Sequence, residues 1–470
     1  MRLAPLCLLL PTAALAYNET IHERITRAAL PDARVLQPPT QEDLDAFRAL
    51  FWRKASATPG FAQRFPTPAS FDAWAFKEFL MLDPAARVHG FDLDPEKPMP
   101  RGELLALASR WPDDDERNRH RYLRDPRTRE IVKASDGTPM PYDSATLDFG
   151  SLSGTTSQGH AHYGLVDGPL SDDPEVLKKD PRRFAVPPTA HAYGAEFAQL
   201  YTDLAALAAQ SGLPSADWLA ATFAGAAFHH LQDVCNQIHT VQVGIYEFFE
   251  RAFIQSKLRD VVTLGGLLGE RRSLKQVGLR LIANHHLMSE DYFAKHLPED
   301  VKYDAVDPAL DGAGTASALA KRIIDISSQE APEVYRLAWT FSAPTLRDGV
   351  HGHEYESNKD NPDDYVDPSK REAIDKFFQI EGRGLRRAVS ALRIWQRQFP
   401  GAPHDPVPEL IAYHAQAAAR RARYLPASPE QTGIAWGYPA AAAALAAGVA
   451  LTIWSFLGWQ RRRRRFAGER

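Results

Sequence analysis

The chain has 470 residues, of which 44% are hydrophobic, 24% are charged and 10% are aromatic. That length is several times what one hydrophobic core requires, and the composition excludes a disordered, collagenous or multi-span membrane protein. The formal charge is −4, and leaving out Arg2 and the arginine-rich residues 460–470 leaves 48 basic against 58 acidic residues. A body this acidic is a poor general binder of polyanions.

Residues 1–16 have the pattern of a secretory signal peptide. An arginine and an apolar run are followed by small residues just before Tyr17. An uncleaved anchor or a buried first helix is the alternative, but the apolar run is too short to cross a bilayer comfortably, which favours removal. Removal would take Cys7 away and leave Cys235 alone, so the sequence predicts neither an intrachain disulfide nor a thiolate zinc cluster.

Helical periodicity dominates the rest of the chain, and alternating strand-like stretches are scarce. The sequence therefore predicts an all-α, multi-helix domain over residues 17–299 and a helical extension of it over 300–435, which could also be a separate appendage. Long connections rich in Pro, Gly and Asp, the length of functional loops, separate the helices at 83–101, 122–192 and 340–368. The predicted helices are Ile21–Leu30, Gln41–Trp52, Phe71–Leu82, Gly102–Ser109, Ala195–Gln210, Ala216–Asp233, Leu274–His296, Ala316–Trp339, Pro368–Gln398 and Pro408–Tyr424.

The first metal-ligand pattern lies at the end of the helix predicted over Ala216–Asp233. His229 and Asp233 are four residues apart, so both side chains project from one helix face about one turn apart. His239 follows six residues later, where that helix is expected to be ending. Imidazole and carboxylate at this spacing can hold one divalent ion. Taken alone, the triple is also compatible with chance, because His and Asp are common in this chain.

A second pair of the same kind lies in the helix predicted over Leu274–His296. His286 and Glu290 are again four residues apart on an amphipathic helix. A surface ion pair would give the same spacing. His285 precedes His286 directly and is the alternative imidazole donor.

The third pattern exists only after the predicted cleavage. The mature chain would then begin at Tyr17, and His22 would follow about one helical turn later. A free α-amine has a pKa near 8, so a metal can deprotonate it and use it as a ligand. The alternative is that a histidine near a new N-terminus is incidental.

Two further donors are less certain. Asp113 opens an acidic cluster just past the short helix predicted over Gly102–Ser109, and Asp114 or Asp115 could serve in its place. His162 lies in a predicted loop, where His160 is the alternative. A helix-terminating acidic turn and a polar loop would explain these residues without any metal.

The C-terminal region predicts a membrane anchor. Residues 437–459 form an uncharged stretch of the length that crosses a hydrocarbon core, with tryptophans at its ends and five arginines directly after it. A buried core helix is the alternative. The arginines would stay cytoplasmic as part of a basic tail over 460–470, so the sequence predicts a single-pass type I protein with its catalytic domain on the periplasmic or extracellular side.

Taken together and in this order, the motifs resemble the zinc-dependent phospholipase C and single-strand-specific nuclease superfamily. The likeness covers residues 17 to about 295, and its departures are Tyr17 in place of Trp and a longer gap between His239 and His286. The resemblance implies a mainly helical secreted domain with three zinc ions in a cleft. By the same resemblance, one ion would take Asp113, His162, His229 and Asp233, a second would take His239, His286 and Glu290, and a third would take Tyr17, His22 and Asp233.

The function that this resemblance implies is phosphodiester hydrolysis by a metal-activated water, with Asp113 orienting or deprotonating that water. Glu290 in the later motif and the predicted anchor beside a lipid surface favour a phospholipid substrate. A single-strand-specific nuclease on the same site is the first alternative, with single-stranded nucleic acid as its substrate. An anchored protein that keeps zinc for stability only is the second. A His–Glu metalloprotease is disfavoured because the sequence contains no His-Glu-x-x-His, and no protein partner is implied.

Overall fold

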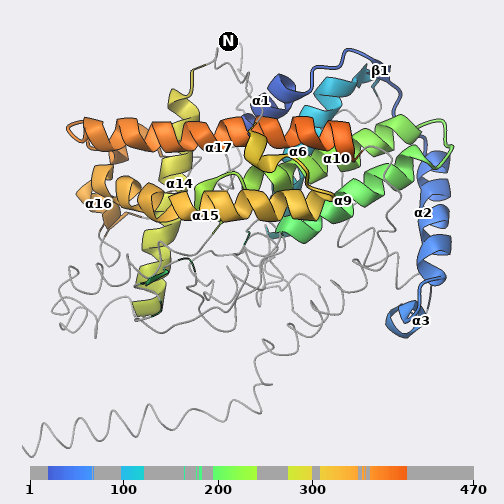
Figure 1. The fold of residues 1–470 in the computed structure, drawn as a ribbon, viewed down its shortest axis with the longest axis horizontal. Helices are drawn as coiled ribbons and strands as arrows, with labels where there is room; N and C mark the ends of the chain where they lie inside the picture. Colours follow the sequence, from blue (N-terminus) through green and yellow to red (C-terminus); the bar gives the residue numbers. More distant parts are fainter. Residues whose placement is uncertain are drawn as a thin grey trace, which may run out of the picture. The chain divides into compact units, whose positions relative to one another are not determined.

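The computed structural model describes residues 19–65, 97–120, 194–240, 274–298, 307–347 and 360–399, with a few single positions between them such as Gly164 and Tyr355. This part is rich in helix and contains one two-residue antiparallel pair of strands, so the prediction of an all-α protein is confirmed (Figure 1). The elements are α1 Glu19–Ala29, β1 Val35–Leu36, α2 Gln41–Ser56, α3 Phe61–Arg64, β2 Met99–Pro100, α6 Arg101–His120, α9 Gly194–Ala209, α10 Ala216–Asp233, η5 Gln237–His239, α14 Leu274–His296, η6 Pro308–Leu310, α15 Ala316–Phe341, α16 Pro344–Arg347, η7 Pro362–Tyr365 and α17 Arg371–Gln398.

The chain divides into two compact units, Met1–Arg420 and Arg421–Arg470, and every described residue belongs to the first. The predicted signal peptide, the helices predicted near residues 71–82 and 408–424, and the predicted membrane segment 437–459 lie outside the described residues. Within the described part, no helix combines the length and the apolar character that a membrane crossing requires.

Helix boundaries follow the sequence pattern closely where local signals are strong. Both α10 and α14 begin and end at the predicted residues. The start of α2 is held by a capping box, in which the Thr40 side chain accepts from the Asp43 backbone amide and the Asp43 side chain accepts from the Thr40 amide. These helices therefore needed no tertiary information to be located.

The prediction that a helix ends at Ser109 is wrong. Helix α6 continues to His120, with Pro112 inside it, so Asp113 lies within a helix rather than in a turn after one. Proline disfavours a helix interior because it lacks an N–H and crowds the preceding turn. The buried face of α6, which includes Leu104, Leu105 and Ala108, packs against α1 and α10, and the helix continues through Pro112 despite this local preference.

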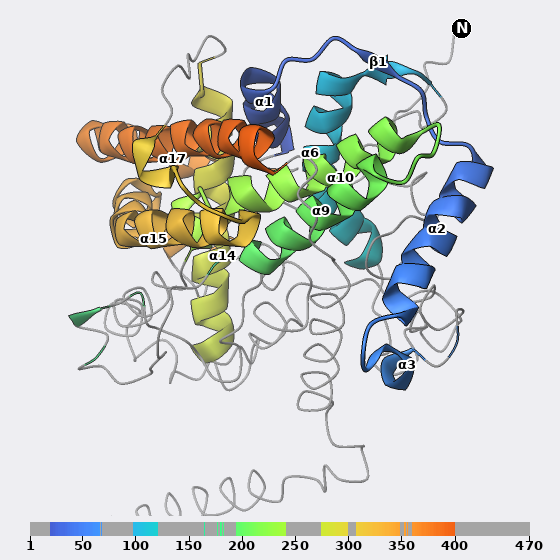
Figure 2. The same cartoon turned by 45° about the vertical axis from the view of Figure 1, so that its right-hand side comes forward.

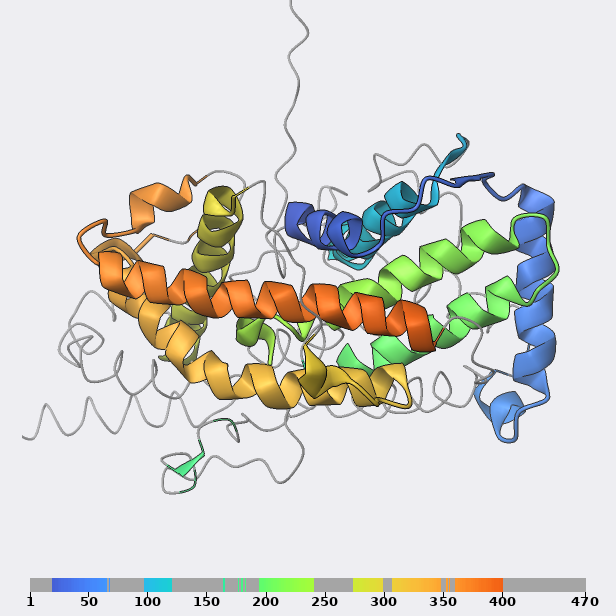
Figure 3. The same ribbon diagram turned by 45° about the horizontal axis from the view of Figure 1, so that its top comes forward.

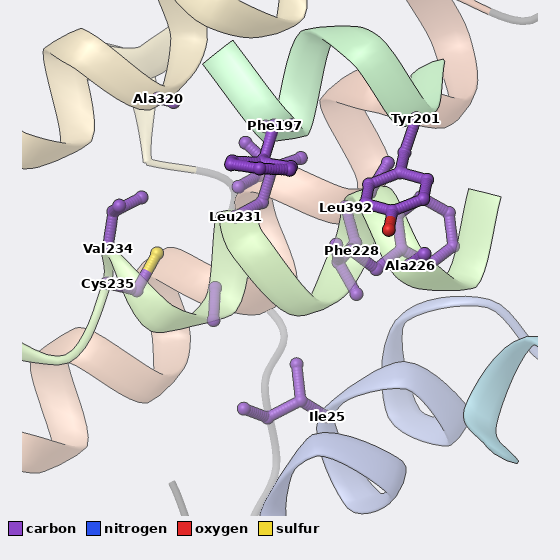
Figure 4. Packing of buried hydrophobic residues seen from close by; sticks show 14 of the residues in the cluster. Ile25, Phe197, Tyr201, Ala226, Phe228, Leu231, Val234, Cys235, Ala320 and Leu392 are labelled. Carbon is purple, nitrogen blue, oxygen red and sulfur yellow. The ribbon is translucent and has the colours of Figure 1, made fainter. Parts of the chain in front are cut away.

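The core is built around α9 and α10, which pack along each other (Figure 2). Helices α6 and α1 pack together, and α6 lies against α10. In the close view, Phe197 and Tyr201 of α9 lie over the face of α10 that carries Phe228 and Leu231 (Figure 4). Gly225 permits the approach of α10 to α6, because a Cβ there would lie only 2.4 Å from the Ala108 Cβ.

Residues 307–399, assigned above to a helical extension, share this core. Helices α15 and α17 run alongside each other (Figure 3), and their contacts include α9 for α15 and both α1 and α10 for α17. Trp395 of α17 packs edge-on against Phe228 of α10, with ring centroids 4.8 Å apart. α15 also contacts η5, the short turn that carries His239. These helices therefore support the region where the predicted ligands lie.

Candidate metal centre

Three of the predicted ligands meet between α1 and α10. Asp233, the last residue of α10, lies between two imidazoles, with Oδ1 3.4 Å from His22 Nε2 and Oδ2 3.0 Å from His229 Nε2. The two rings stack with centroids 4.3 Å apart, and all three side chains are buried. We call His22, His229 and Asp233 the first triad. It joins residues that are more than 200 positions apart in the sequence.

Hydrogen bonds at the other ring nitrogens set the tautomers of both histidines. His229 Nδ1 lies 2.8 Å from the backbone carbonyl oxygen of Ser109, and His22 Nδ1 lies 2.5 Å from Gln232 Oε1. Both oxygens are acceptors, so each Nδ1 carries the proton and donates. In its neutral form each imidazole then has its Nε2 lone pair facing Asp233, which is the arrangement of metal-binding histidines.

A chain of hydrogen bonds fixes the orientation of the Gln232 amide. Gln232 Nε2 donates to Thr26 Oγ1 at 2.8 Å, and Thr26 Oγ1 donates to Ser109 Oγ at 3.0 Å. Ser109 Oγ in turn donates to the Ala106 carbonyl oxygen at 2.6 Å. Because Nε2 is committed to Thr26, Oε1 is the atom that faces His22. This series of hydrogen bonds links α1, α6 and α10 around the first triad.

The second set of predicted ligands also converges. His239 Nε2 lies 3.2 Å from His286 Nε2 and 3.2 Å from Glu290 Oε1, and His286 Nε2 lies 3.3 Å from Glu290 Oε2. The two imidazole rings stack with centroids 4.9 Å apart. We call His239, His286 and Glu290 the second triad. Its members come from η5 and α14, and all are buried.

Asn236 holds two members of the second triad at once. Its Nδ2 donates to Glu290 Oε1 at 2.7 Å, and its Oδ1 accepts from the Ile238 backbone amide at 3.1 Å. The second bond caps η5, the turn that carries His239. The single side chain thus fixes both the carboxylate on α14 and the imidazole on η5.

The protonation states in the second triad suit a cation. Burial lowers the pKa of His239, which leaves the imidazole neutral near pH 7. Burial alone would raise the pKa of Glu290, but the neighbouring His286 and His239 outweigh it and lower that pKa to about 2. A neutral imidazole and an ionised carboxylate are the forms that bind a metal.

The spacing within both triads fits a small divalent ion. A tetrahedral ion with ligand bonds of about 2.0–2.1 Å keeps its donor atoms roughly 3.3 Å apart. The separations between donors described above run from 3.0 to 3.4 Å. Within each triad the donor atoms all lie within 4.8 Å of one another. Nitrogen and carboxylate donors in this geometry suit zinc, and two buried triads that could each hold a metal ion are present in the described part of the chain.

The two triads are neighbours. Asp233 Oδ1 of the first lies 3.9 Å from His239 Nδ1 of the second. His239 therefore directs one ring nitrogen toward each triad. This contact places the two sites within one continuous cluster of ionisable side chains.

The orientation of α14 determines which of His285 and His286 lies in the second triad. His285 Nδ1 donates to the Leu281 carbonyl oxygen at 2.6 Å, and its Nε2 lies 3.0 Å from Ser342 Oγ. Its ring stacks on Trp339 with centroids 4.9 Å apart, and burial lowers its pKa to about 4. His285 therefore supports the packing of α14 against α15, whereas His286 lies in the triad.

The other predicted ligands are only partly located. Tyr17, His160 and His162 lie outside the described residues. For Asp113 the backbone position in α6 is described, four residues after Ser109, whose carbonyl oxygen binds His229. Gly164, which follows His162 by two positions in the sequence, donates its amide to the His239 carbonyl oxygen at 3.0 Å. The chain just after His162 is thereby attached to the second triad.

Sequence reasoning missed the residues that orient the ligands. Gln232 and Asn236 lie inside the motif that spans His229 to His239, so their neighbourhood was visible, but their partners lie on α1 and α14. Gln237 shows the same pattern, since its Nε2 donates to Glu330 Oε2 on α15 at 2.8 Å. Polar residues buried between two ligands were the only local signal.

Comparison of the chain with protein-family models, curated proteins and solved structures found no significant match.

Proposed function

We propose that this chain is an exported, membrane-anchored zinc-dependent phosphodiesterase of phospholipase C type. The observation that carries the proposal is the pair of buried triads joined by the contact between Asp233 and His239. Two adjacent cation sites of this composition suit hydrolysis at phosphorus, where negative charge must be stabilised on several oxygens at once. Of the three ions expected, the third would use Tyr17 with His22 and share Asp233.

Bound zinc would supply a water of near-neutral pKa and a positive charge beside the phosphate. The chain's own residues prepare for this in two ways. Ser109 and Gln232 keep the Nε2 lone pairs of the first triad directed at the ion, and Asn236 keeps Glu290 in place. Asp113, which follows Ser109 by one helical turn on α6, is assigned the role of orienting the attacking water or accepting its proton.

The cysteine nearest the ligands does not offer a competing mechanism. Cys235 is fully buried beside Asp233 in sequence, and burial raises the pKa of its thiol to about 12. A thiol in that state is a poor nucleophile at neutral pH. The state of Cys235 therefore favours hydrolysis by water over a covalent intermediate on this cysteine.

Two observations support a phospholipid over a nucleic acid as substrate. Glu290 is the carboxylate of the second triad, as in the phospholipase branch of the family that the sequence resembles. The apolar segment 437–459 would hold the enzyme at a lipid surface, where the effective concentration of substrate is high. Both favour the lipid branch, and the nuclease is the alternative that the assay below tests.

The test uses the full-length chain purified in detergent. Metal content is measured by mass spectrometry, and the protein is assayed for release of p-nitrophenol from p-nitrophenyl phosphorylcholine and for cleavage of single-stranded DNA. We expect two or three zinc ions per chain and phosphorylcholine ester hydrolysis that a chelator abolishes and zinc restores. DNA cleavage alone would establish the nuclease, and zinc-loaded protein that does neither would overturn the enzyme proposal.

A second measurement tests processing and anchoring. Mass spectrometry of the mature protein should find Tyr17 as its first residue, and membrane fractionation should lose the protein when residues 437–470 are deleted. An N-terminus ahead of Tyr17 would remove the third ion from the proposal. The sites formed by the two triads would remain, because their ligands do not include the α-amine.

A further inference from the structure

Helix α17 carries a buried acid that the metal ligands do not account for. Glu381 is only 2% exposed, and among the residues that the structure describes its Oε1 has no hydrogen-bond partner. An isolated carboxylate in such a place is strongly disfavoured unless it is protonated or a cation lies nearby. Glu381 therefore needs a charge partner or a proton.

The packing of α17 on α14 places Glu381 opposite the second triad. Phe377 of α17 and Phe293 of α14 meet with ring centroids 6.3 Å apart. Glu381 follows Phe377 by four residues and Glu290 precedes Phe293 by three, so both acids lie on the faces that the two helices turn toward each other. The neighbouring Ile380 carbonyl oxygen accepts from Gln237 Nε2 at 3.1 Å, which ties this turn of α17 to η5.

The charges around Glu381 do not balance without a further cation. Glu330 is already neutralised by Arg383 at 2.7 Å and Arg387 at 3.2 Å. In the described part of the chain, the partners of Glu290 are the two imidazoles and the Asn236 amide. Among the residues that the structure describes, Glu381 forms no ion pair, and Arg387, the nearest positive charge acting on it, is already paired with Glu330. A divalent ion at the second triad would supply a counter-charge.

The pKa of Glu381 agrees with a buried position near other carboxylates. Burial and the charges of Glu290 and Glu330 together outweigh the charge of Arg387 and raise the pKa of Glu381 to about 8. Glu381 lies outside the triad itself, whose three donors are His239, His286 and Glu290. A water molecule between Glu381 and the ion would connect the two.

We propose that Glu381 is an outer ligand of the second metal centre, which accepts a hydrogen bond from a water bound to the ion held by the second triad. The inference rests on the proposed metal-dependent function and extends the centre to α17, beyond the residues over which the sequence resembles a known family. Glu381 acts through the water, so it is a positioning residue. Groups of this kind typically change metal affinity by about 10- to 100-fold.

The test is made in an Asp233→Asn background, where the first triad is disabled and the remaining ion is that of the second triad. In this background, Glu381→Gln is compared with the protein that keeps Glu381. Cobalt(II) binding is followed by visible spectroscopy and by competition with a chelator. We expect Glu381→Gln to weaken cobalt binding by about 10- to 100-fold and to change the absorption band. The matched control is Glu333→Gln, a partly exposed acid on α15 paired with Arg336 and Lys376, which should leave the affinity unchanged.

The same experiment separates the failure of this inference from the failure of the proposed function. If the full-length parent chain binds no ion, the proposed function fails. If it binds ions and Glu381→Gln has the parent affinity, only the role of Glu381 is overturned. Should Glu381→Gln fold poorly, Glu381→Asp decides: it keeps the charge and should retain binding within about tenfold, whereas a loss as large as that of a ligand substitution contradicts the water-mediated role.

Discussion

The two triads reach the same donor geometry by different means. In the first, the supporting groups hold the imidazoles, since Ser109 and Gln232 bind the Nδ1 atoms of His229 and His22. In the second, the supporting group Asn236 holds the carboxylate of Glu290 and caps the turn of His239. The first triad is thus built between long helices, whereas the second depends on a three-residue turn and its neighbours. The difference indicates that the second is the more easily disturbed by changes outside the ligands.

The largest expected effect comes from Asp233, the residue of the first triad that also contacts the second. Asp233→Asn removes the carboxylate of the first triad and its contact with His239, so phosphodiesterase activity should fall by at least about a thousandfold, the equivalent of several kcal/mol of charge stabilisation. Metal analysis should still find an ion at the second triad. Loss of every ion would show that the triads bind as one unit. The exposed Asp45→Asn on α2 is the matched control and should leave both readouts unchanged.

Acidification should destabilise the protein through His285 of α14. The folded-state pKa of His285 is about 4, below the ordinary value of 6.5, so the stability it contributes is present above pH 6.5 and is lost as the pH falls toward 4. In the metal-free protein this loss amounts to about 3 kcal/mol. His285→Gln should flatten this limb of the unfolding free energy measured with denaturant, while the exposed His353→Gln should retain it. An unchanged slope in His285→Gln would contradict the structural role of His285.

The next effect tests how closely the first triad depends on helix packing. Gly225→Ala would place a Cβ 2.4 Å from Ala108 Cβ and 2.9 Å from the Leu105 carbonyl oxygen, so α10 must move away from α6. We expect a loss of about 1–3 kcal/mol in unfolding free energy and weaker binding at the first triad, because His229 and the Ser109 carbonyl would separate. Gly314→Ala, which meets nothing within 4 Å, is the control. Wild-type stability of Gly225→Ala would refute this account of the packing.

The smallest effect concerns Gln232 and Asn236, the residues that orient the ligands of the first and second triads. Gln232→Met should weaken the ion of the first triad by at least about tenfold and leave the second unaffected, and Asn236→Ser should do the reverse. Serine keeps a side-chain oxygen that can cap η5 but loses the donor to Glu290. Cobalt titrations of both variants measure the two ions separately. Equal weakening of both ions in either variant would show that Gln232 and Asn236 do not act on their triads independently.

Much of this architecture was predictable because it depends on nearby residues. The periodicity over Ala216–Asp233 and Leu274–His296 located both ligand-bearing helices, and the four-residue spacings placed His229 with Asp233 and His286 with Glu290 on single faces. Helix α6 was the exception. The apolar periodicity weakened after Ser109 and Pro112 disfavours a helix interior, yet the helix continues to His120.

Interactions within one or two turns made three features predictable from the sequence: the helical fold class, the positions of the ligand-bearing helices and the donors that share a helix face. Three other features depend on tertiary contacts: the entry of His286 rather than His285 into the second triad, the orientation of the ligands by Gln232 and Asn236, and the burial of Glu381 on α17. The contacts that orient the ligands join residues 54 to 210 positions apart. They arise when the apolar faces of the helices are buried against one another, which no local pattern records.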